Sequence, residues 1–486
     1  MLIVVSFILN SALNFLLGLC IAGVLGPEFY GRFSVAFTGA MVLYMLLFDW
    51  LRLSATRFYS EDARDSAPSL RASLNLGYVV GSGLLVAGAG LLASLGFDIG
   101  LSAPMIAAIA FVAIAYGFFD FFGALLRARF RNGAYSGLVI LKNLLSFAAM
   151  LGAAWFWRDP TLVMLAAALS TLAATLALNG QATDPQARLR QASGAQMAVY
   201  LRYGAPIVLA NIFYQAIILA NRSFAAAHLD FAAAGQLSLP TDMCLRLMLA
   251  VGAALDILLF QLAVHKRNSE GVEAAQRQVA RNSLAIFAIM VLLCVGYVQD
   301  MPAFAALVAP EKFRADFGAL SVILAPGVAL FCIGQFCLNP IAQLEGRTGR
   351  VALAALASAA LDLSWLALLP PRDLAGYAWA HSVSLGGGFV MMLALTWRWR
   401  AYWPRLRDLA GIAGAGAAAA LAMQPLHDLK PALLALSLTA AIGGGVFFAL
   451  LLLFNPAGEV RPLLAKARAK LGRSSERIVT EPASIR

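Results

Sequence analysis

Long apolar stretches, each about as long as a membrane-crossing helix, alternate with short polar segments along the chain. A transmembrane helix needs about 20 mostly apolar residues, and windows of this kind, bounded by charged residues, Gly and Pro, occur fourteen times. Their approximate limits are 2–25, 33–57, 74–97, 103–126, 137–157, 160–180, 203–225, 238–264, 283–299, 317–340, 350–369, 374–396, 409–425 and 431–454. The pattern predicts an all-α polytopic membrane protein with about 14 transmembrane helices.

Two polar interruptions, 181–202 and 265–282, are longer than the others. The first follows six spans, and the last two spans stand apart from the twelve before them. We therefore expect a first six-helix bundle over residues 1–190, a second over 191–400, two additional helices over 401–456 and a basic tail over 457–486.

The composition excludes a soluble globular enzyme and a disordered chain. Of the 486 residues, 61% are hydrophobic and 13% are charged, whereas soluble domains carry about 25% charged residues. The mean hydropathy is +0.79, and disordered chains are poor in apolar residues.

The positions of Lys and Arg predict the orientation of the spans. The chain has 36 Lys and Arg against 25 Asp and Glu, a formal charge of +11. If the N-terminus is cytoplasmic, 26 of the basic residues fall on the cytoplasmic side and six outside, as expected because basic loops stay inside. We therefore expect both termini to be cytoplasmic, and the positive charge to contact anionic membrane lipids rather than nucleic acid.

Known catalytic and metal-binding motifs are absent from the sequence. It contains no P-loop, no H-E-x-x-H and no Gly-rich strand-to-helix turn. The five cysteines lack metal-like spacing, and there are four histidines. We therefore expect no catalytic residue, no metal and no cofactor, and a protein that is not an enzyme.

A weak internal echo links the segments that follow spans 1 and 7. "VLGPEFYGRFS" resembles "AHLDFAAAGQLS", so that Gly31 matches Gly235 and Ser34 matches Ser238 at an offset of 204. Repeated halves are typical of transporters, which place the substrate site between them.

Longer segments resemble a known family in order and spacing. "LNFLLGLCIAGVLGPEFYGRFSVAF" with "LFDWLRLSATRFYSED" resembles the opening of polysaccharide and O-antigen flippases, which belong to the multidrug/oligosaccharidyl-lipid/polysaccharide exporter superfamily. "YLRYGAPIVLANIFYQAIILANRSF" with "AAAGQLSLPTD" resembles their seventh and eighth spans. "LVAPEKFRADFGAL" with "QLEGRTGRVALAALASAALDLSWLALLPPRDLAGYAWA" resembles spans nine to twelve. The family usually has Asp-Arg late in span 7, where this chain has Asn221-Arg222.

The resemblance implies two six-helix bundles around a central cavity that opens alternately to either side, with two further helices. It also implies transport of a polyprenyl diphosphate-linked oligosaccharide across the bacterial inner membrane, for lipopolysaccharide, capsule or exopolysaccharide assembly. The expected partners are that substrate, membrane lipids and membrane proteins of glycan assembly, and we expect a monomer.

Ionisable residues within spans carry the candidate chemistry, because each is expensive in the membrane and should face the bundle interior. They are Asp49, Arg52, Asp120, Lys142, Arg222, Asp242, Arg246, Asp256, Asp362 and His381. A guanidinium binds phosphate oxygens in bidentate fashion, so Arg52 and Arg246 are the leading substrate contacts. The remaining substrate-binding candidates are Arg222, Asn14 and Gln215, the two amides for sugar hydroxyls or interhelical hydrogen bonds.

Matching depths along neighbouring spans suggest ion pairs. Asp120 and Lys142 lie at similar depth in spans 4 and 5, which predicts a structural ion pair, and Arg222 can reach Asp242. Asp362 and His381 lie at similar depth in spans 11 and 12. They are candidates for proton coupling if they meet, and otherwise two independently packed residues.

Other functions remain open. A cation-coupled multidrug exporter of the same superfamily would favour an acidic or aromatic cavity. A glycan-polymerising enzyme would need a large outer loop, and the longest here, about 300–316, is short. A membrane scaffold without transport is the simplest alternative.

Overall fold

The computed structural model describes residues 2–95, 100–427 and 429–458, and this part of the chain contains helices but no strand. The longer helices are α1 (Leu2–Phe58), α2 (Glu61–Ser66), α3 (Pro68–Leu95), α4 (Ala103–Ala128), α5 (Asn132–Trp157), α6 (Pro160–Ala177), α7 (Gly194–His228), α8 (Phe231–Glu270), α9 (Val272–Gln299), α10 (Met301–Val308), α11 (Arg314–Ile333), α12 (Asn339–Leu344), α13 (Gly349–Leu368), α14 (Leu374–Thr396), α15 (Leu406–Met423) and α16 (Ala432–Phe454). Short helical turns are η1 (Asn179–Gln181), η2 (Leu189–Gln191), η3 (Glu311–Phe313), η4 (Gly334–Leu338), η5 (Trp397–Tyr402), η6 (Gln424–Leu426) and η7 (Pro456–Gly458).

Thirteen of the described helical segments are long and apolar enough to cross a membrane. The first of them, Asn10–Phe58, has 49 residues, about 74 Å at 1.5 Å per residue, more than twice the ~30 Å of a hydrocarbon core. It is broken at Gly26, whose φ of 75° is non-helical, and Pro27 starts a new helix. α1 therefore forms two arms, residues 2–25 and 27–58, and counts as two spans. The predicted all-α fold with about 14 spans is confirmed.

Some helices extend beyond the predicted apolar windows. The interruption expected at 265–282 is helical apart from a turn at Gly271, where φ is 87°, because α8 runs to Glu270 and α9 begins at Val272. Lys, Arg, Glu, Gln and Ala are good helix formers, so the helices continue in polar sequence. A hydropathy window locates the edge of the membrane rather than the end of a helix.

Contacts divide the chain into two compact units. Unit 1 comprises Met1–Ala250, Val308–Phe331 and Glu345–Leu395, and unit 2 comprises Val251–Leu307, Cys332–Leu344 and the chain from Thr396 onward. All substrate-binding, coupling and ion-pair candidates lie in unit 1, and of the ionisable residues within spans only Asp256 lies in unit 2. The predicted boundaries at residues 190, 400 and 456 remain predictions.

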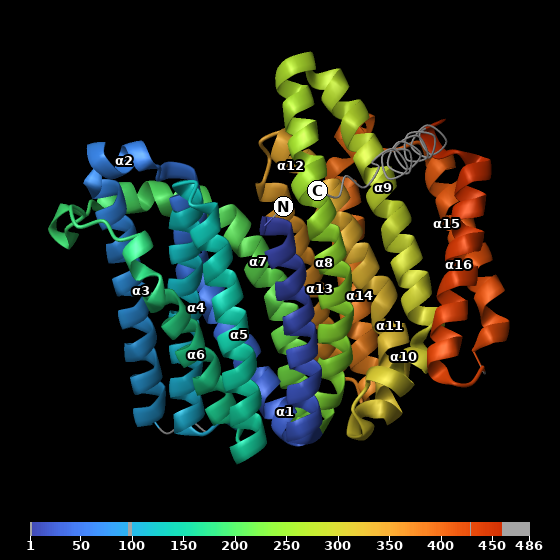
Figure 1. Ribbon diagram of the computed structural model, residues 1–486, viewed down its shortest axis with the longest axis horizontal. Helices are drawn as coiled ribbons and strands as arrows, with labels where there is room; N and C mark the ends of the chain where they lie inside the picture. The colour runs from blue at the N-terminus through green and yellow to red at the C-terminus, as the bar shows by residue number, and fades with distance from the viewer. Residues whose placement is uncertain (1, 96–99, 428, 459–486) are drawn as a thin grey trace, which may run out of the picture. The chain divides into compact units, whose positions relative to one another are not determined.

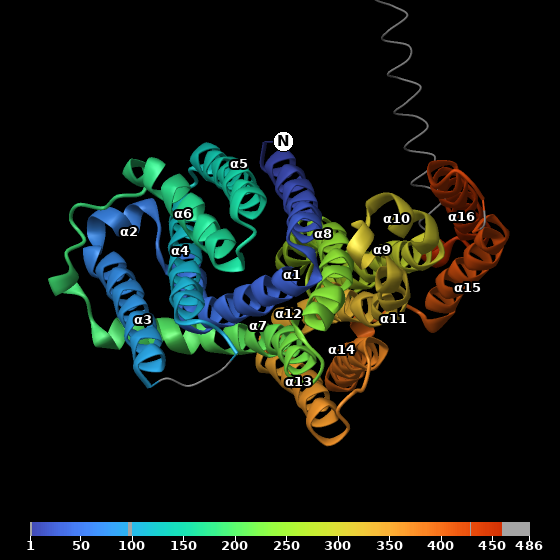
Figure 2. The ribbon, with the colours of Figure 1, turned by 90° about the horizontal axis from the view of Figure 1, so that it is seen from below.

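In unit 1, the second arm of α1 packs against α4 and α7, and α4 packs against α3, α5 and α6 (Figures 1 and 2). Aromatic side chains fill this core. The ring of Phe48 in α1 lies 5.2 Å from that of Tyr78 in α3, which stacks at 6.2 Å on Phe121 in α4. In unit 2, α9, α15 and α16 pack together around the buried side chains of Ile412 and Phe447.

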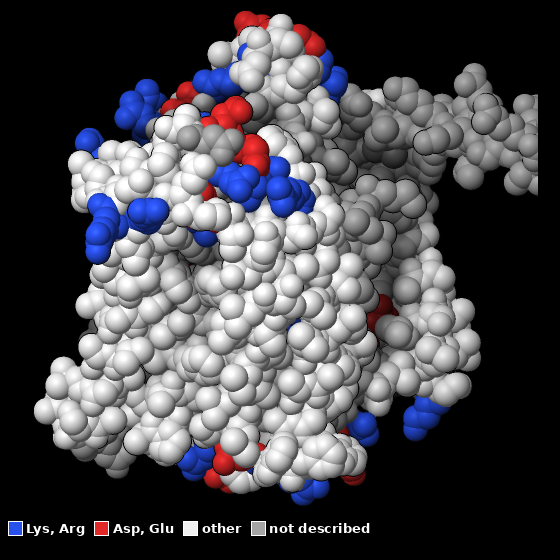
Figure 3. Space-filling view, turned by 60° about the vertical axis from the view of Figure 1, so that its left-hand side comes forward, with Lys and Arg blue, Asp and Glu red and all other residues white. Residues whose placement is uncertain are grey.

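Charged residues lie toward two opposite ends of the face drawn in Figure 3, and the broad surface between them is almost free of charge. Large hydrophobic side chains such as Leu84, Val86 and Leu92 of α3 are exposed. An apolar band between two charged rims is the surface expected of a protein that spans a bilayer.

Candidate functional site

The two segments of the sequence echo meet in unit 1, where the second arm of α1 crosses the start of α8. The hydroxyl oxygens of Ser34 and Ser238 lie 2.8 Å apart, and both residues are buried. A Cβ on Gly31 or on Gly235 would overlap a backbone carbonyl of the other helix. Residues 204 positions apart thus touch each other, as expected at an axis that relates two halves. We call these four residues the helix crossing.

Arg222 of α7 holds both helices of the helix crossing. Its Nη2 donates to the Asp242 carboxylate of α8 in an ion pair, and its Nη1 donates to Thr38 Oγ1 of α1 at 2.6 Å. The Tyr30 hydroxyl also donates to Asp242, at 3.4 Å. The depth match between Arg222 and Asp242 therefore identified a real pair. Because Thr38 and Asp242 are themselves 204 positions apart, Arg222 bridges equivalent positions of the two halves.

Arg246 lies about one turn beyond Asp242 on α8 and is only partly buried. Its Nη1 donates to the backbone carbonyl of Asn14 in the first arm of α1, and it lies beside Gly18, where a Cβ would come within 3.2 Å of that nitrogen. No ion pair of the described residues includes Arg246. Its positive charge is therefore not matched by a carboxylate of its own.

Three amide side chains form a cluster beside this contact, which we call the asparagine triad. Asn143 of α5 donates to Asn10 Oδ1 at 2.8 Å, and Asn14 donates to the same oxygen at 2.9 Å. Asn14 also approaches Asn143 Oδ1 at 3.5 Å. Gln215 of α7, the other amide candidate, is partly exposed and has no hydrogen-bond partner in the described part of the chain.

Arg52 belongs to a second polar cluster, deeper along the second arm of α1. Its Nε donates to Asp49 Oδ1 at 2.6 Å, and Asn211 of α7 donates to Asp49 Oδ2 at 3.2 Å. The Arg52 side chain is 29% exposed and that of Asp49 is 3% exposed. The guanidinium therefore reaches solvent while the carboxylate that orients it stays buried.

Asp120 and Lys142 do not form the direct ion pair that their depths predicted. The Tyr44 hydroxyl donates to the Asp120 carboxylate, and Lys142 Nζ lies over the rings of Tyr116 and Phe119, 5.0 and 5.8 Å from their centroids. The two charges interact electrostatically at longer range. Depth alone does not fix the direction of a side chain around its helix, and here the neighbouring aromatic residues provide closer partners.

Asp362 and His381 are both buried, but no hydrogen bond joins them in the described structure. Asn221 Nδ2 of α7 donates to both oxygens of Asp362, each at 2.9 Å. His381 lies instead beside Arg222, and the two line a space too small for a water molecule. The carboxylate of Asp362 is thus held next to the position where the resembling family usually has its own aspartate.

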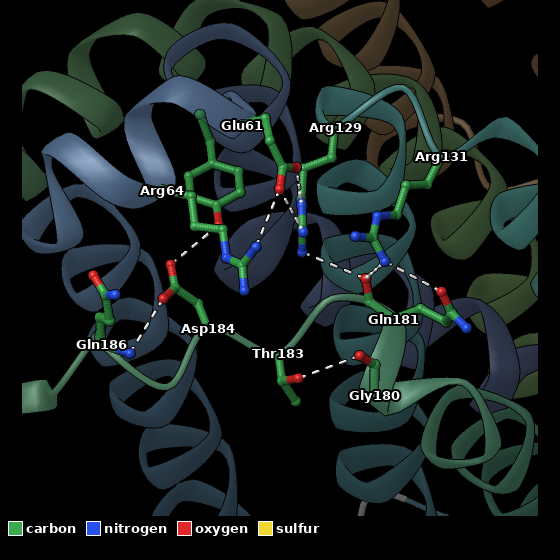
Figure 4. Close-up of polar contacts among 10 residues, drawn as sticks. Glu61, Arg64, Arg129, Arg131, Gly180, Gln181, Thr183, Asp184 and Gln186 are labelled. Atoms are coloured by element: carbon green, nitrogen blue, oxygen red, sulfur yellow. Dashed lines mark hydrogen bonds and ion pairs between the residues drawn. The ribbon is translucent and has the colours of Figure 1, made fainter.

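Sequence reasoning missed a polar cluster that holds the connection between α6 and α7 (Figure 4). Glu61 of α2 accepts two hydrogen bonds from the Arg129 guanidinium, one of 2.8 Å, and these hold the pKa of the Glu61 carboxyl at about 2. Arg131 donates to the Gln181 carbonyl at 3.0 Å, and the Tyr59 hydroxyl donates to Asp184 at 3.2 Å. Partial burial raises the pKa of Tyr59 to about 12.

This linker cluster joins three connections that are far apart in the sequence. A sequence signal was the concentration of charge in "SEDARD" and "RARFR" (60–65 and 127–131), but pairing depends on the path of the irregular segment 179–193. Its contacts fasten that segment to the first helices of unit 1.

The described residues contain no group of three or more His, Cys, Asp or Glu side chains that could hold a metal ion. What unit 1 offers are guanidinium groups at successive depths, Arg222, Arg246 and Arg52, with neutral amides between them. Such groups can bind phosphate and hydroxyl oxygens without any covalent chemistry.

Comparison with known proteins gives the fold its context. No protein-family model and no curated protein sequence matches the chain. Among solved structures, the lipid II flippase MurJ in an inward closed conformation matches with a TM-score of 0.69 and 11% identity, over 95% of this chain and 100% of that one. An inward-facing MATE family multidrug resistance transporter matches with a TM-score of 0.62 and 16% identity, over 81% and 94%. A MOP superfamily transporter from Pyrococcus furiosus matches with a TM-score of 0.55 and 16% identity, over 82% and 94%.

These identities are too low to transfer an activity, but the coverage is nearly complete on both sides. The expectation drawn from the resemblance is confirmed at the level of fold: the chain has the fold that these solved transporters share.

Proposed function

We propose that the protein is an alternating-access flippase that moves a polyprenyl diphosphate-linked oligosaccharide across the bacterial inner membrane. The observation that carries the proposal is Arg246, a partly exposed guanidinium within the membrane-spanning part of unit 1 that contacts a backbone carbonyl and no carboxylate. An unmatched cation in the membrane is expensive. A diphosphate would supply the missing negative charge.

The exposure of the other charged groups supports an anionic substrate. Asp49 and Asp362 are buried behind their hydrogen-bond partners, whereas the Arg52 side chain is 29% exposed. A passing molecule therefore meets guanidinium groups before it meets these carboxylates. The Arg222 side chain is 6% exposed and paired with Asp242 in this conformation. We therefore place it at one end of the substrate path.

The asparagine triad supports a sugar-bearing substrate. The backbone carbonyl of Asn14 accepts a hydrogen bond from Arg246, so the amides of the triad lie next to the proposed phosphate contact. Amides donate and accept hydrogen bonds, as sugar hydroxyls do. We propose that the triad and Gln215 contact the first sugars of the glycan.

The helix crossing is the proposed outer gate. In the orientation predicted by the basic loops, its end of unit 1 faces away from the cytoplasm, and the two helices meet there without intervening side chains. Separation of these helices would open the path to the outside, and their return would close it.

Coupling of transport to protons remains a proposal for Asp362 and His381. They face different neighbours, Asn221 and Arg222, which are adjacent in α7. Protonation of either side chain would change its interaction with its neighbour in α7. If Asp362→Asn and His381→Gln both keep the wild-type response of flipping to a proton gradient in proteoliposomes, the two residues are structural only.

The second candidate is a cation-coupled multidrug exporter, which is supported by the likeness to the MATE fold. The two candidate functions differ in the charge of the transported molecule. A cationic drug would be repelled by Arg246 and Arg52, so substitution of these residues should leave or improve drug binding under that alternative.

The test is ligand-induced thermal stabilisation of the purified protein by an undecaprenyl diphosphate-linked disaccharide. We expect stabilisation of the wild type, and loss of most of it in Arg246→Ala and Arg52→Ala. Arg32→Ala is the matched control, because Arg32 lies on the same helix as Arg52 but is exposed and paired with Glu28. Equal stabilisation of all four proteins would overturn the assignment of the phosphate contacts.

The setting follows from the same proposal. We propose that the protein is a monomer with both termini in the cytoplasm, that it contacts anionic membrane lipids, and that its product feeds lipopolysaccharide, capsule or exopolysaccharide assembly by membrane proteins of that process.

A further inference from the structure

Arg71 is a buried guanidinium to which the proposed function gives no role. It lies in the first turn of α3, in unit 1, and the residue is 9% exposed. Its Nε and Nη1 are buried and form no hydrogen bond, and no ion pair of the described residues includes it. Burial of a charged donor without an acceptor is expensive, so an unmatched group of this kind calls for an explanation.

Aromatic rings surround this guanidinium where an acceptor is expected. Its carbon lies 4.8 Å from the centre of the Phe121 ring and 5.9 Å from that of the Tyr59 ring. The Tyr59 hydroxyl in turn donates to Asp184 Oδ2 at 3.2 Å, and Asp184 interacts electrostatically with Arg71. Asp184 is therefore a carboxylate that attracts Arg71 without forming an ion pair, and Tyr59 is bound to one of its oxygens.

Asp184 belongs to a compact turn of segment 179–193, which we call the linker. Its Oδ1 accepts a hydrogen bond from the Gln186 backbone N–H at 3.3 Å (Figure 4). Pro185 stiffens the backbone between them, because the proline ring fixes φ and restricts the residue before it. The turn can therefore shift as a unit while Oδ1 stays engaged, and Oδ2 is the oxygen that can exchange one donor for another.

Contacts on both sides of the turn hold the linker in the conformation seen here. Before the turn, the Gln181 carbonyl accepts from Arg131 at 3.0 Å. After it, the Ser193 N–H donates to Ser73 Oγ at 2.9 Å. Between these contacts, the Tyr59 hydroxyl binds the turn through a neutral donor. The linker is thus fastened by single hydrogen bonds that can break one at a time.

We propose that the linker alternates between two conformations and that Arg71 is its partner in the second. In the first, seen here, Tyr59 donates to Asp184 and Arg131 donates to the Gln181 carbonyl. In the second, Asp184 Oδ2 accepts from Arg71, and the Gln181 contact is given up. A guanidinium offers a carboxylate its charge and two parallel hydrogen bonds, whereas a tyrosine hydroxyl offers one hydrogen bond. This gain offsets the lost contact.

A shift of the linker acts directly on the start of α7. Ser193, the last residue of the linker, caps α7 by accepting from the Gln196 N–H at 3.5 Å. The same helix carries Asn211, which donates to Asp49 of α1. The two linker conformations therefore bias the position of a helix that binds α1. This switch needs no substrate, so it goes beyond the proposed function and does not depend on it.

The experiment is fluorine NMR of the purified protein in detergent, without substrate, with a trifluoromethyl label on Thr183→Cys. Thr183 is exposed and adjoins Asp184 in the linker, so the label reports on the turn without replacing a core side chain. The native cysteines are first replaced. We expect two resonances, one for each conformation of the linker.

Three variants identify the conformations. Tyr59→Phe should raise the second resonance relative to the first by about tenfold, because the first conformation alone loses a hydrogen bond to a charged group. Arg71→Gln should abolish the second resonance. Arg64→Gln is the matched control, because Arg64 is an arginine of the same cluster whose partner is Glu61 rather than Asp184, and both resonances should persist.

Several results would overturn the proposal. They are a single resonance that stays single in Tyr59→Phe, a second resonance that persists in Arg71→Gln, and one that is lost equally in Arg64→Gln. If Arg71→Gln does not purify as a monodisperse protein, Asp184→Asn tests the pair from the linker. It removes the charge that attracts Arg71, so an unchanged second resonance in Asp184→Asn contradicts the switch.

Discussion

Substitution of Gly31 by Ala should open the helix crossing. An ideal Cβ on Gly31 lies 1.8 Å from the Phe231 carbonyl oxygen, whereas real Cβ atoms essentially never approach another atom within 3.0 Å. The two helices must therefore separate by about 1.2 Å, the difference between these distances. The displaced atom belongs to the backbone, so no side-chain rotation can relieve the overlap.

The energy of this change can be bounded from overpacking. Insertion of one extra group into a packed interior destabilises it by about 1 to 3 kcal/mol. The penalty applies only while the helix crossing is closed, so it should shift the equilibrium toward the open conformation by about 5- to 150-fold. The Arg222–Asp242 ion pair, which holds the same helices, opposes the shift and favours the lower part of that range.

The assay is labelling of Ser34→Cys by a membrane-impermeant maleimide from the outside. The five native cysteines, Cys20, Cys244, Cys294, Cys332 and Cys337, are first replaced so that a single thiol reports. Gly31→Ala should raise the labelling rate by the factor above. Gly39→Ala is the control, because Gly39 lies on the same arm of α1 with nothing within 4 Å of its Cβ position, and its rate should not change.

An unchanged labelling rate in a properly folded Gly31→Ala protein would refute the reasoning. It would show that the helix crossing does not separate, or that its separation does not expose Ser34. A rise in both variants would show a general loosening rather than the opening of this contact.

Two further predictions concern stability. Asp242→Asn leaves the buried Arg222 without its carboxylate, and removal of one partner from a buried pair typically costs about 3 to 5 kcal/mol. We therefore expect a lower melting temperature and a lower protein level. A wild-type melting curve would show that Thr38 alone suffices to hold the guanidinium. Burial raises the pKa of Asp300, at the corner between α9 and α10, from 3.8 to about 6, so the folded state binds this proton more tightly than the unfolded chain does. The stability it contributes is complete below about pH 4 and is lost as the pH rises to about 6, a change of about 1 to 2 kcal/mol after allowance for its half exposure. Asp300→Asn should therefore stabilise the protein at pH 8 but not at pH 4, and equal melting-temperature shifts at the two pH values would contradict this.

The sequence predicted the fold well because the membrane imposes one simple pattern. Twenty apolar residues between charges must cross as a helix, so the spans could be counted even where α1 is continuous apart from a break at Gly26. Helix ends outside the membrane were missed, because polar segments such as 265–270 can be helical without an apolar face.

For the candidate site, the sequence predicted only the depth of each residue along its helix. Depth correctly paired Arg222 with Asp242, but it failed for Asp120 and Lys142, whose side chains turn toward Tyr44 and Tyr116. Rotation around the helix axis and the irregular path of the linker depend on tertiary packing. The echo between Ser34 and Ser238 was visible in the sequence, but their direct contact required the structure.

The central claim is tested most directly by flipping in proteoliposomes. A fluorescent undecaprenyl diphosphate-linked oligosaccharide is placed in both leaflets, and the fraction accessible to an impermeant quencher is followed with time. The account predicts equilibration of the two leaflets by the wild type and by Arg32→Ala, and none by the Arg52→Ala, Arg246→Ala double variant. Rapid flipping by that double variant, or transport of a cationic dye by the wild type without movement of the diphosphate lipid, would contradict it.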